Sequence, residues 1–209
     1  MSAIHSAVQV KLAEAEALVD YYSIRHDLEI AAQLCQHAID LDAVSGRDSI
    51  LTEGIVTGAI IRYCRCFAGG LRLGLHRKDI EDLRPLLLTA HDYFKALRDK
   101  FVAHPVNPFE EHWVSASVTE RDGVIEPITH IGHGSNRMLL SAETAKSLRQ
   151  LTDGVLEIIE EKIKPEEQKV LEVIKNHDPK FIHSAGLHTP ARFTHADVNR
   201  QRKQNRKQK

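Results

Sequence analysis

The sequence predicts an all-α protein: a helical bundle with one inserted β-hairpin and a basic C-terminal tail. Apolar residues recur every three or four positions through most of the 209 residues, which is typical of amphipathic helices. One stretch instead alternates apolar and polar residues around an Asp-Gly pair, which indicates a hairpin. We expect the bundle in residues 1–177, the hairpin at about 113–131, and an irregular, basic, disordered tail in residues 178–209.

Two helices are expected in the first 42 residues. The first spans residues 3–20 and the second spans 24–42, with Tyr21-Tyr22-Ser23 as a break between them. The inward stripe of the second helix keeps a helical period: Leu28, Ala31, Ala32, Cys35 and Ile39.

A third helix, at about 49–67, carries two glycines one turn apart. Small residues at the spacing of Gly54 and Gly58 allow a neighbouring helix to approach closely, so we expect a tight helix contact there. Gly69-Gly70 should end the helix. Residues 69–80 read as a loop, since they do not match the glycine pattern that cradles phosphates.

The fourth helix has the clearest amphipathic pattern. Pro85 suits its first turn, and the helix should end at His104-Pro105. Its apolar side chains follow at steps of three and four residues: Leu87, Ala90, Phe94, Leu97 and Phe101.

The β-hairpin is predicted from alternation in residues 114–119, a turn at Asp122-Gly123 and a returning strand at 124–131. A lone two-stranded hairpin is marginal in water, so we expect this one to pack on the helices. After it, Ser141 should cap a helix at about 142–163, and Pro165 should start a shorter one.

The near-neutral net charge conceals an asymmetry. Residues 199–209 hold six of the 28 basic residues and no acid, which leaves 22 bases against 29 acids in the body, a net charge of −7. Such a tail is either a solvated extension or a nucleic-acid anchor. Three cysteines do not form a disulfide framework, and no apolar run is long enough for a membrane span, so we expect a cytoplasmic protein without membrane contact.

One short motif bears on function: Arg98-Asp99, followed after five intervening positions by His104. Together with the run Arg62 to Phe67 on the preceding helix, it resembles the R-x(4–6)-H signature of the HEPN superfamily, in its abortive-infection-like branch. The resemblance covers roughly residues 24–165. It implies a bundle of four or five helices and metal-independent cleavage of RNA, as in toxin–antitoxin and antiphage-defence systems.

The resemblance also implies roles and partners. His104 would move protons, Arg98 would stabilise the phosphate charge, and Asp99 would orient one of them. Further contacts to the RNA phosphates are assigned to Arg62, Arg65, Lys100 and Asn107. A homodimer is expected, with the site shared between the motif helices, and an antitoxin or another defence component is a further candidate partner. The alternative is a non-catalytic HEPN-type interaction module, since the fold does not fix the activity.

Local physical chemistry is compatible with a catalytic site at Arg98 and His104, and equally with an ordinary helix C-terminus. On an ideal helix Arg98 and His104 would point about 120° apart, but the residue before Pro105 is pushed out of the helical region. Carbonyl groups at the helix end favour a protonated imidazole, which suits a general acid. The same two side chains could instead cap the helix.

Neither a cofactor nor a metal is indicated by residue spacing. Cys64 and Cys66 lack a second cysteine pair, so they are expected as small buried side chains rather than zinc ligands. His91 is expected on the surface. The later histidines show no metal-ligand spacing: His130, His133, His183, His188 and His195.

Overall fold

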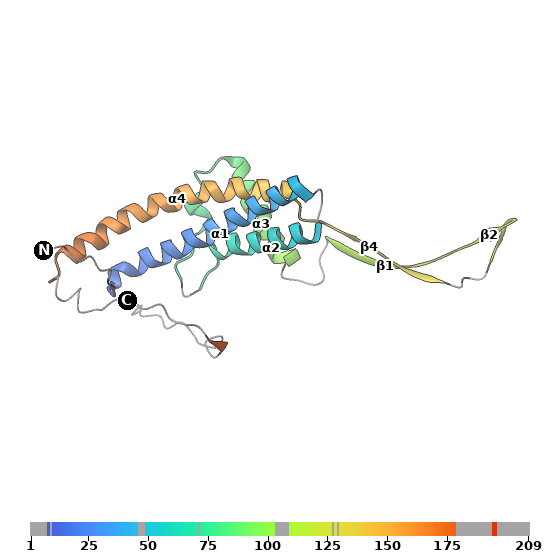
Figure 1. Ribbon diagram of the computed structural model, residues 1–209, viewed down its shortest axis with the longest axis horizontal. Coiled ribbons are helices and arrows are strands. Elements are labelled where there is room, and N and C mark those ends of the chain that lie inside the picture. The colour runs from blue at the N-terminus through green and yellow to red at the C-terminus, as the bar shows by residue number, and fades with distance from the viewer. Residues whose placement is uncertain are drawn as a thin grey trace. The chain divides into compact units, whose positions relative to one another are not determined.

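Figure 1 shows a computed structural model of the protein. It describes residues 8, 10–45, 49–70, 72–102, 109–126, 128, 130–178 and 194–195. The expected catalytic His104, the expected phosphate contact Asn107 and the basic tail from residue 196 lie outside these ranges.

Within the described ranges the protein is mostly helical, as predicted. Its α-helices are α1 (Glu16–Ser45), α2 (Ser49–Arg65), α3 (Pro85–Leu97) and α4 (Ala142–Lys175). Short helices adjoin them: the 3-10 helices η1 (Ala13–Ala15) and η2 (Arg77–Ile80), and the π-helix η3 (Arg98–Val102) directly after α3. Pro85 occupies the first turn of α3, as the sequence predicts.

The β-structure is a hairpin between η3 and α4. Strand β1 (Glu110–Ala116) pairs antiparallel with β4 (Ile131–Arg137), and β2 (Glu120–Arg121) pairs with β3 (Val124–Ile125). The predicted turn is confirmed, since Asp122 and Gly123 both have positive φ, 49° and 81°, as a type I′ turn requires. The paired strands extend beyond the predicted 113–131 at both ends.

The prediction that the hairpin packs on the helices is wrong for its strands. Apart from the half-buried Glu110 and Gly134, the residues of β1 and β4 are exposed on both faces. Three contacts anchor the base of the hairpin instead. The Phe101 and Phe109 rings meet edge to face, Arg137 forms an ion pair with Glu53 of α2 at 3.1 Å, and Met138 accepts a weak hydrogen bond from a tyrosine of α3.

The chain forms two compact units. The first comprises Met1–Glu29, Arg65–Asp82 and Asp153–Lys209, and the second comprises Ile30–Cys64 and Leu83–Thr152. The core of the first unit includes Ile24, Leu28, Cys66, Ile80, Val155 and Ile159. The core of the second includes Cys35, Ile60, Tyr63, Phe94, Leu97, Leu148 and Leu151.

Helix α1 starts at Glu16 rather than residue 3, and it runs unbroken through Tyr21-Tyr22-Ser23. The expected break is absent because these polar side chains have partners outside the helix. The Tyr22 hydroxyl donates to Glu167 of α4 at 2.6 Å, and Ser23 accepts a hydrogen bond from Arg72 at 2.8 Å. They therefore do not compete for the helix backbone.

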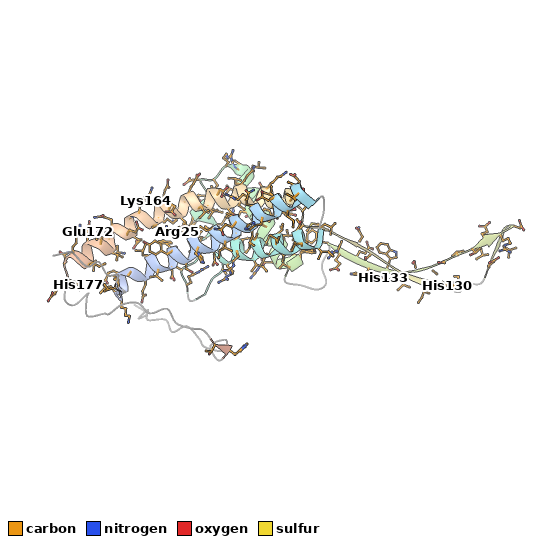
Figure 2. All side chains as sticks on the ribbon, viewed as in Figure 1. Arg25, His130, His133, Lys164, Glu172 and His177 are labelled. Atoms are coloured by element: carbon orange, nitrogen blue, oxygen red, sulfur yellow. The ribbon has the colours of Figure 1, made fainter. Side chains whose placement is uncertain are left out.

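Helix α4 likewise continues through Pro165, where the sequence suggested a restart. Proline removes one backbone hydrogen bond and crowds the preceding turn. Contacts on both sides hold the helix: Lys162 bonds to Asp79 at 3.0 Å, and Glu167 accepts from Tyr22. Figure 2 labels Arg25, whose guanidinium reaches Glu160 of α4 at 3.3 Å.

The connection after α2 is attached to α1 through two buried carboxylates. The Arg72 guanidinium donates to Asp27 at 3.0 Å and to the Arg65 carbonyl at 2.9 Å. Asp20, two turns before Asp27 on the same face of α1, accepts the Leu73 backbone N–H at 2.8 Å. This connection has little regular structure, so side chains of α1 supply its hydrogen bonds.

Replacing Asp27 by alanine should lower the free energy of unfolding by about 2–3 kcal/mol, because Arg72 loses a charged acceptor in a largely buried setting. Urea unfolding followed by circular dichroism measures the loss. Asp40→Ala, at an exposed position of the same helix, is the matched control and should change stability by less than about 0.5 kcal/mol. Equal effects of the two substitutions would contradict the role given to Asp27.

Asp79 should contribute to the pH dependence of stability. Burial alone would raise its pKa, but hydrogen bonds from the His76 backbone N–H and from Lys162 lower it. A carboxyl with a lowered pKa stabilises the fold above its unfolded pKa, and this stabilisation is lost as pH falls through its folded pKa. Asp79→Asn should therefore lose less thermal stability than wild type between pH 7 and about pH 3. Asp82→Asn, an exposed neighbour, should behave as wild type.

Candidate functional site

The candidate site begins where α3 changes into a π-helix. Helix α3 buries Leu87, His91, Phe94 and Leu97, and η3 follows without interruption. Arg98, Asp99 and Lys100 are exposed on η3. A π-turn widens the helix by one residue, is rare, and occurs often at functional sites.

Arg98 and Asp99 form an ion pair on this turn. The Arg98 Nη1 donates to Asp99 Oδ1 at 2.6 Å, and the two side chains are 46% and 55% exposed. The hydrogen bond to Asp99 raises the pKa of Arg98. The guanidinium stays accessible to solvent and has five N–H donors, so the contact with Asp99 leaves donors for an anion.

Cys64 of α2 packs against the end of α3. Its thiol donates weakly to the Phe94 carbonyl at 3.7 Å. Burial raises the pKa of Cys64 to about 12, and the positive charge of Arg98 acts in the opposite direction. The cysteine is thus a small core side chain, and Arg98 lies at the solvent edge of this packing.

The other predicted phosphate contacts have different surroundings. Arg62 is half-buried on α2. Arg65 is exposed, but its Nε lies 3.8 Å from a carboxylate oxygen of the buried Asp27. Lys100 is exposed two residues after Arg98. His104 and Asn107 lie outside the described residues, so the catalytic role of the first and the phosphate contact of the second stay predictions.

His91 is not the surface residue that the sequence suggested. It is 1% exposed, and its Nδ1 lies 2.7 Å from the hydroxyl of Tyr63, which is fully buried. The two rings meet edge to face with centroids 5.9 Å apart. His91 lies seven residues before Arg98, which predicted that it would share the exposed face of the helix with Arg98. It belongs instead to the buried stripe of α3, with Leu87 and Phe94.

The glycines of α2 do not support the close helix contact that was expected. Nothing described lies within 4 Å of where a Cβ on Gly54 would stand, and for Gly58 the nearest atom is Leu34 Cδ1 at 3.6 Å. They contribute instead to an open apolar groove lined by Leu34, Ile50, Leu51, Gly54, Ile55 and Gly58. Ile50 is 75% exposed there.

A polar cluster that the sequence analysis missed lies on the hairpin, where His112 bonds to His133 and Glu110. Residue spacing could not reveal it, because the strand register brings the two histidines together across 21 positions. In the described part of the chain, no three His, Cys, Asp or Glu side chains are grouped to hold a metal ion. No described helix has both the length and the apolar character to cross a membrane.

Comparisons with family models, with curated proteins and with solved structures found no match to this chain.

The three cysteines should be unreactive in the folded protein. Cys35, Cys64 and Cys66 are free and buried, and the raised pKa of Cys64 leaves almost no thiolate at pH 8. Ellman's reagent should detect no fast thiol at pH 8 and all three after denaturation. A rapid reaction that disappears in Cys64→Ala would contradict the burial described for this residue.

Proposed function

We propose that the protein is a metal-independent endoribonuclease of the HEPN type, acting in a toxin–antitoxin or antiphage-defence role, with Arg98 and His104 as its central residues. One observation supports it most: the exposed Arg98 guanidinium, held by Asp99 on a π-turn at the end of the amphipathic helix α3. A permanently charged, oriented and accessible group of this kind suits recognition of a phosphate.

The chemistry follows from the two side chains. The ribose 2′-hydroxyl gives up its proton and attacks the adjacent phosphorus, and the bond to the 5′-oxygen breaks. The products are a 2′,3′-cyclic phosphate and a 5′-hydroxyl that takes up a proton. His104 handles the protons, and Arg98 stabilises the negative charge on the phosphate oxygens in the transition state.

Asp99 has two opposing effects in this proposal. Its carboxylate fixes the Arg98 side chain, which lowers the entropy lost on binding, but it also reduces the net positive charge that attracts RNA. Lys100, the next residue, restores a positive charge on the same turn. Asp99 is therefore a positioning residue, and the attraction of RNA comes from Arg98 and Lys100 together.

The apolar groove supports a second candidate function, a non-catalytic interaction module. Its lining includes the exposed Ile50 and Leu51 of α2, and solvated apolar surface of this kind is common where proteins bind partners. In this alternative Arg98 and Asp99 form an ordinary surface ion pair, and the purified protein cleaves no RNA.

Incubation of the full chain with total RNA in EDTA distinguishes the two functions. Wild type should produce fragments with 2′,3′-cyclic phosphate ends. Arg98→Ala and His104→Ala should each lower the cleavage rate by about 100-fold or more, because each removes a group that acts in the transition state. Denaturing gels and end-group analysis measure the rates and the products.

Two control variants test whether the effect is specific to the motif. Arg84→Ala removes an exposed arginine at the other end of α3, and His130→Ala removes an exposed histidine of the hairpin. Both should cleave within about twofold of wild type. If wild type cuts no RNA while light scattering shows an intact homodimer, the interaction module replaces the nuclease.

A further inference from the structure

The paired strands bring three titratable side chains to one face of the hairpin. In the register of β1 and β4, Val114 lies opposite His133, and residues directly opposite share a face. His112 and Glu110 are two and four residues before Val114, so the alternation of the strand places them on that same face. Figure 2 labels His133 on this ribbon.

These side chains form a linear chain of close polar contacts. Nε2 of His112 lies 2.9 Å from Glu110 Oε1, and Nδ1 of His112 lies 3.0 Å from Nε2 of His133. The planes of the two imidazole rings are inclined by only 13° and their centroids are 5.2 Å apart, so the rings meet nearly end to end through these nitrogens. The His112 side chain is 53% exposed, so solvent reaches the ring nitrogens.

We propose that Nδ1 of His112 and Nε2 of His133 bind a divalent transition-metal ion such as Zn²⁺, with Glu110 as a positioning residue. The inference is independent of the proposed nuclease. Imidazole nitrogen suits Zn²⁺, Ni²⁺ and Cu²⁺ as a ligand. The site has two protein ligands, and water completes the coordination.

The distances agree with a shared metal ion. Two nitrogens bound to one tetrahedral zinc ion at about 2.05 Å lie about 3.3 Å apart, so binding requires the nitrogens to separate by roughly 0.3 Å and each ring to turn by roughly 35°, which brings both lone pairs onto the ion. In the hydrogen-bonded pair of neutral imidazoles, His133 carries its single proton on Nε2, facing His112 Nδ1. The ion would take the place of that proton, which moves to His133 Nδ1 by exchange with water, so that each bound ring has one N–H, on His112 Nε2 and on His133 Nδ1.

Glu110 favours the tautomer of His112 that metal binding through Nδ1 requires. A carboxylate only accepts hydrogen bonds, so Nε2 of His112 carries its proton toward Glu110, and the Nδ1 lone pair is directed at His133. Carboxylate–histidine–metal arrangements of this type fix ring orientation and make the imidazole a stronger ligand.

The backbone beneath the site is held on the opposite face. Trp113 lies across from Gly134, and its indole fills the space that a side chain at residue 134 would need. This packing restricts both strands next to the two histidines. An isolated two-stranded ribbon is marginal, so a metal bridge between β1 and β4 would stabilise it without burying any surface.

Zinc binding to the full chain tests the proposal, with Zn²⁺ alone as the probe and a chromophoric chelator in competition. Wild type should bind one Zn²⁺ equivalent that His112→Ala and His133→Ala lack. Glu110→Gln should retain that equivalent with an affinity about 10–100-fold weaker. His130→Ala, an exposed histidine on the same ribbon, should titrate as wild type does.

A second measurement guards against a disrupted hairpin. Zn²⁺ should slow amide hydrogen exchange in β1 and β4 of wild type and of His130→Ala, and it should leave exchange in His133→Gln unchanged. The proposal is overturned if both histidine variants bind as much Zn²⁺ as wild type, equally tightly, or if Zn²⁺ leaves strand exchange in wild type unaltered.

Discussion

The buried carboxylate of Asp27 is the constraint on which the first unit depends. It lies on α1 with 3% exposure, and it receives the Arg72 guanidinium at 3.0 Å. Leaving water costs a carboxylate several kcal/mol unless it is paired and hydrogen-bonded. The connection after α2 must therefore return to α1. Gly74 makes that return possible, because a Cβ there would lie 2.8 Å from the Ala68 carbonyl oxygen.

The helices were largely predictable because each buries a stripe of apolar side chains, and these recur every three or four positions in the sequence. The apolar period identified α2, α3 and most of α1, and Ser141 caps α4 as predicted. Local sequence patterns did not predict that α1 and α4 continue without a break. Tyr22 and Pro165 favour breaks in isolation, but partners distant in sequence hold both helices through them. Tertiary hydrogen bonds therefore outweighed local preference at these positions.

The candidate sites were less predictable, for two physical reasons. The spacing of apolar residues in α3 cannot distinguish an α-turn from a π-turn at its end. The one extra residue in a π-turn changes that spacing only after Arg98. The hairpin cluster depends on register, and a one-residue slip would send His133 to the opposite face. Alternation and the Asp-Gly turn predicted a hairpin, but they also suggested one buried face. Anchoring at the base alone, through Phe109, Arg137 and Met138, was not encoded in that pattern.

The π-turn and the hairpin base are physically linked. Phe101 belongs to η3 and meets Phe109 at the start of the hairpin, with ring centroids 6.1 Å apart. This contact joins the described residues on either side of residues 103–108, the segment that carries His104 in the sequence. Bringing two ends of a chain segment together costs conformational entropy, and this aromatic contact offsets part of that cost. In the nuclease that we propose, such an arrangement would let the energy of phosphate binding act on the reacting groups rather than on ordering the chain.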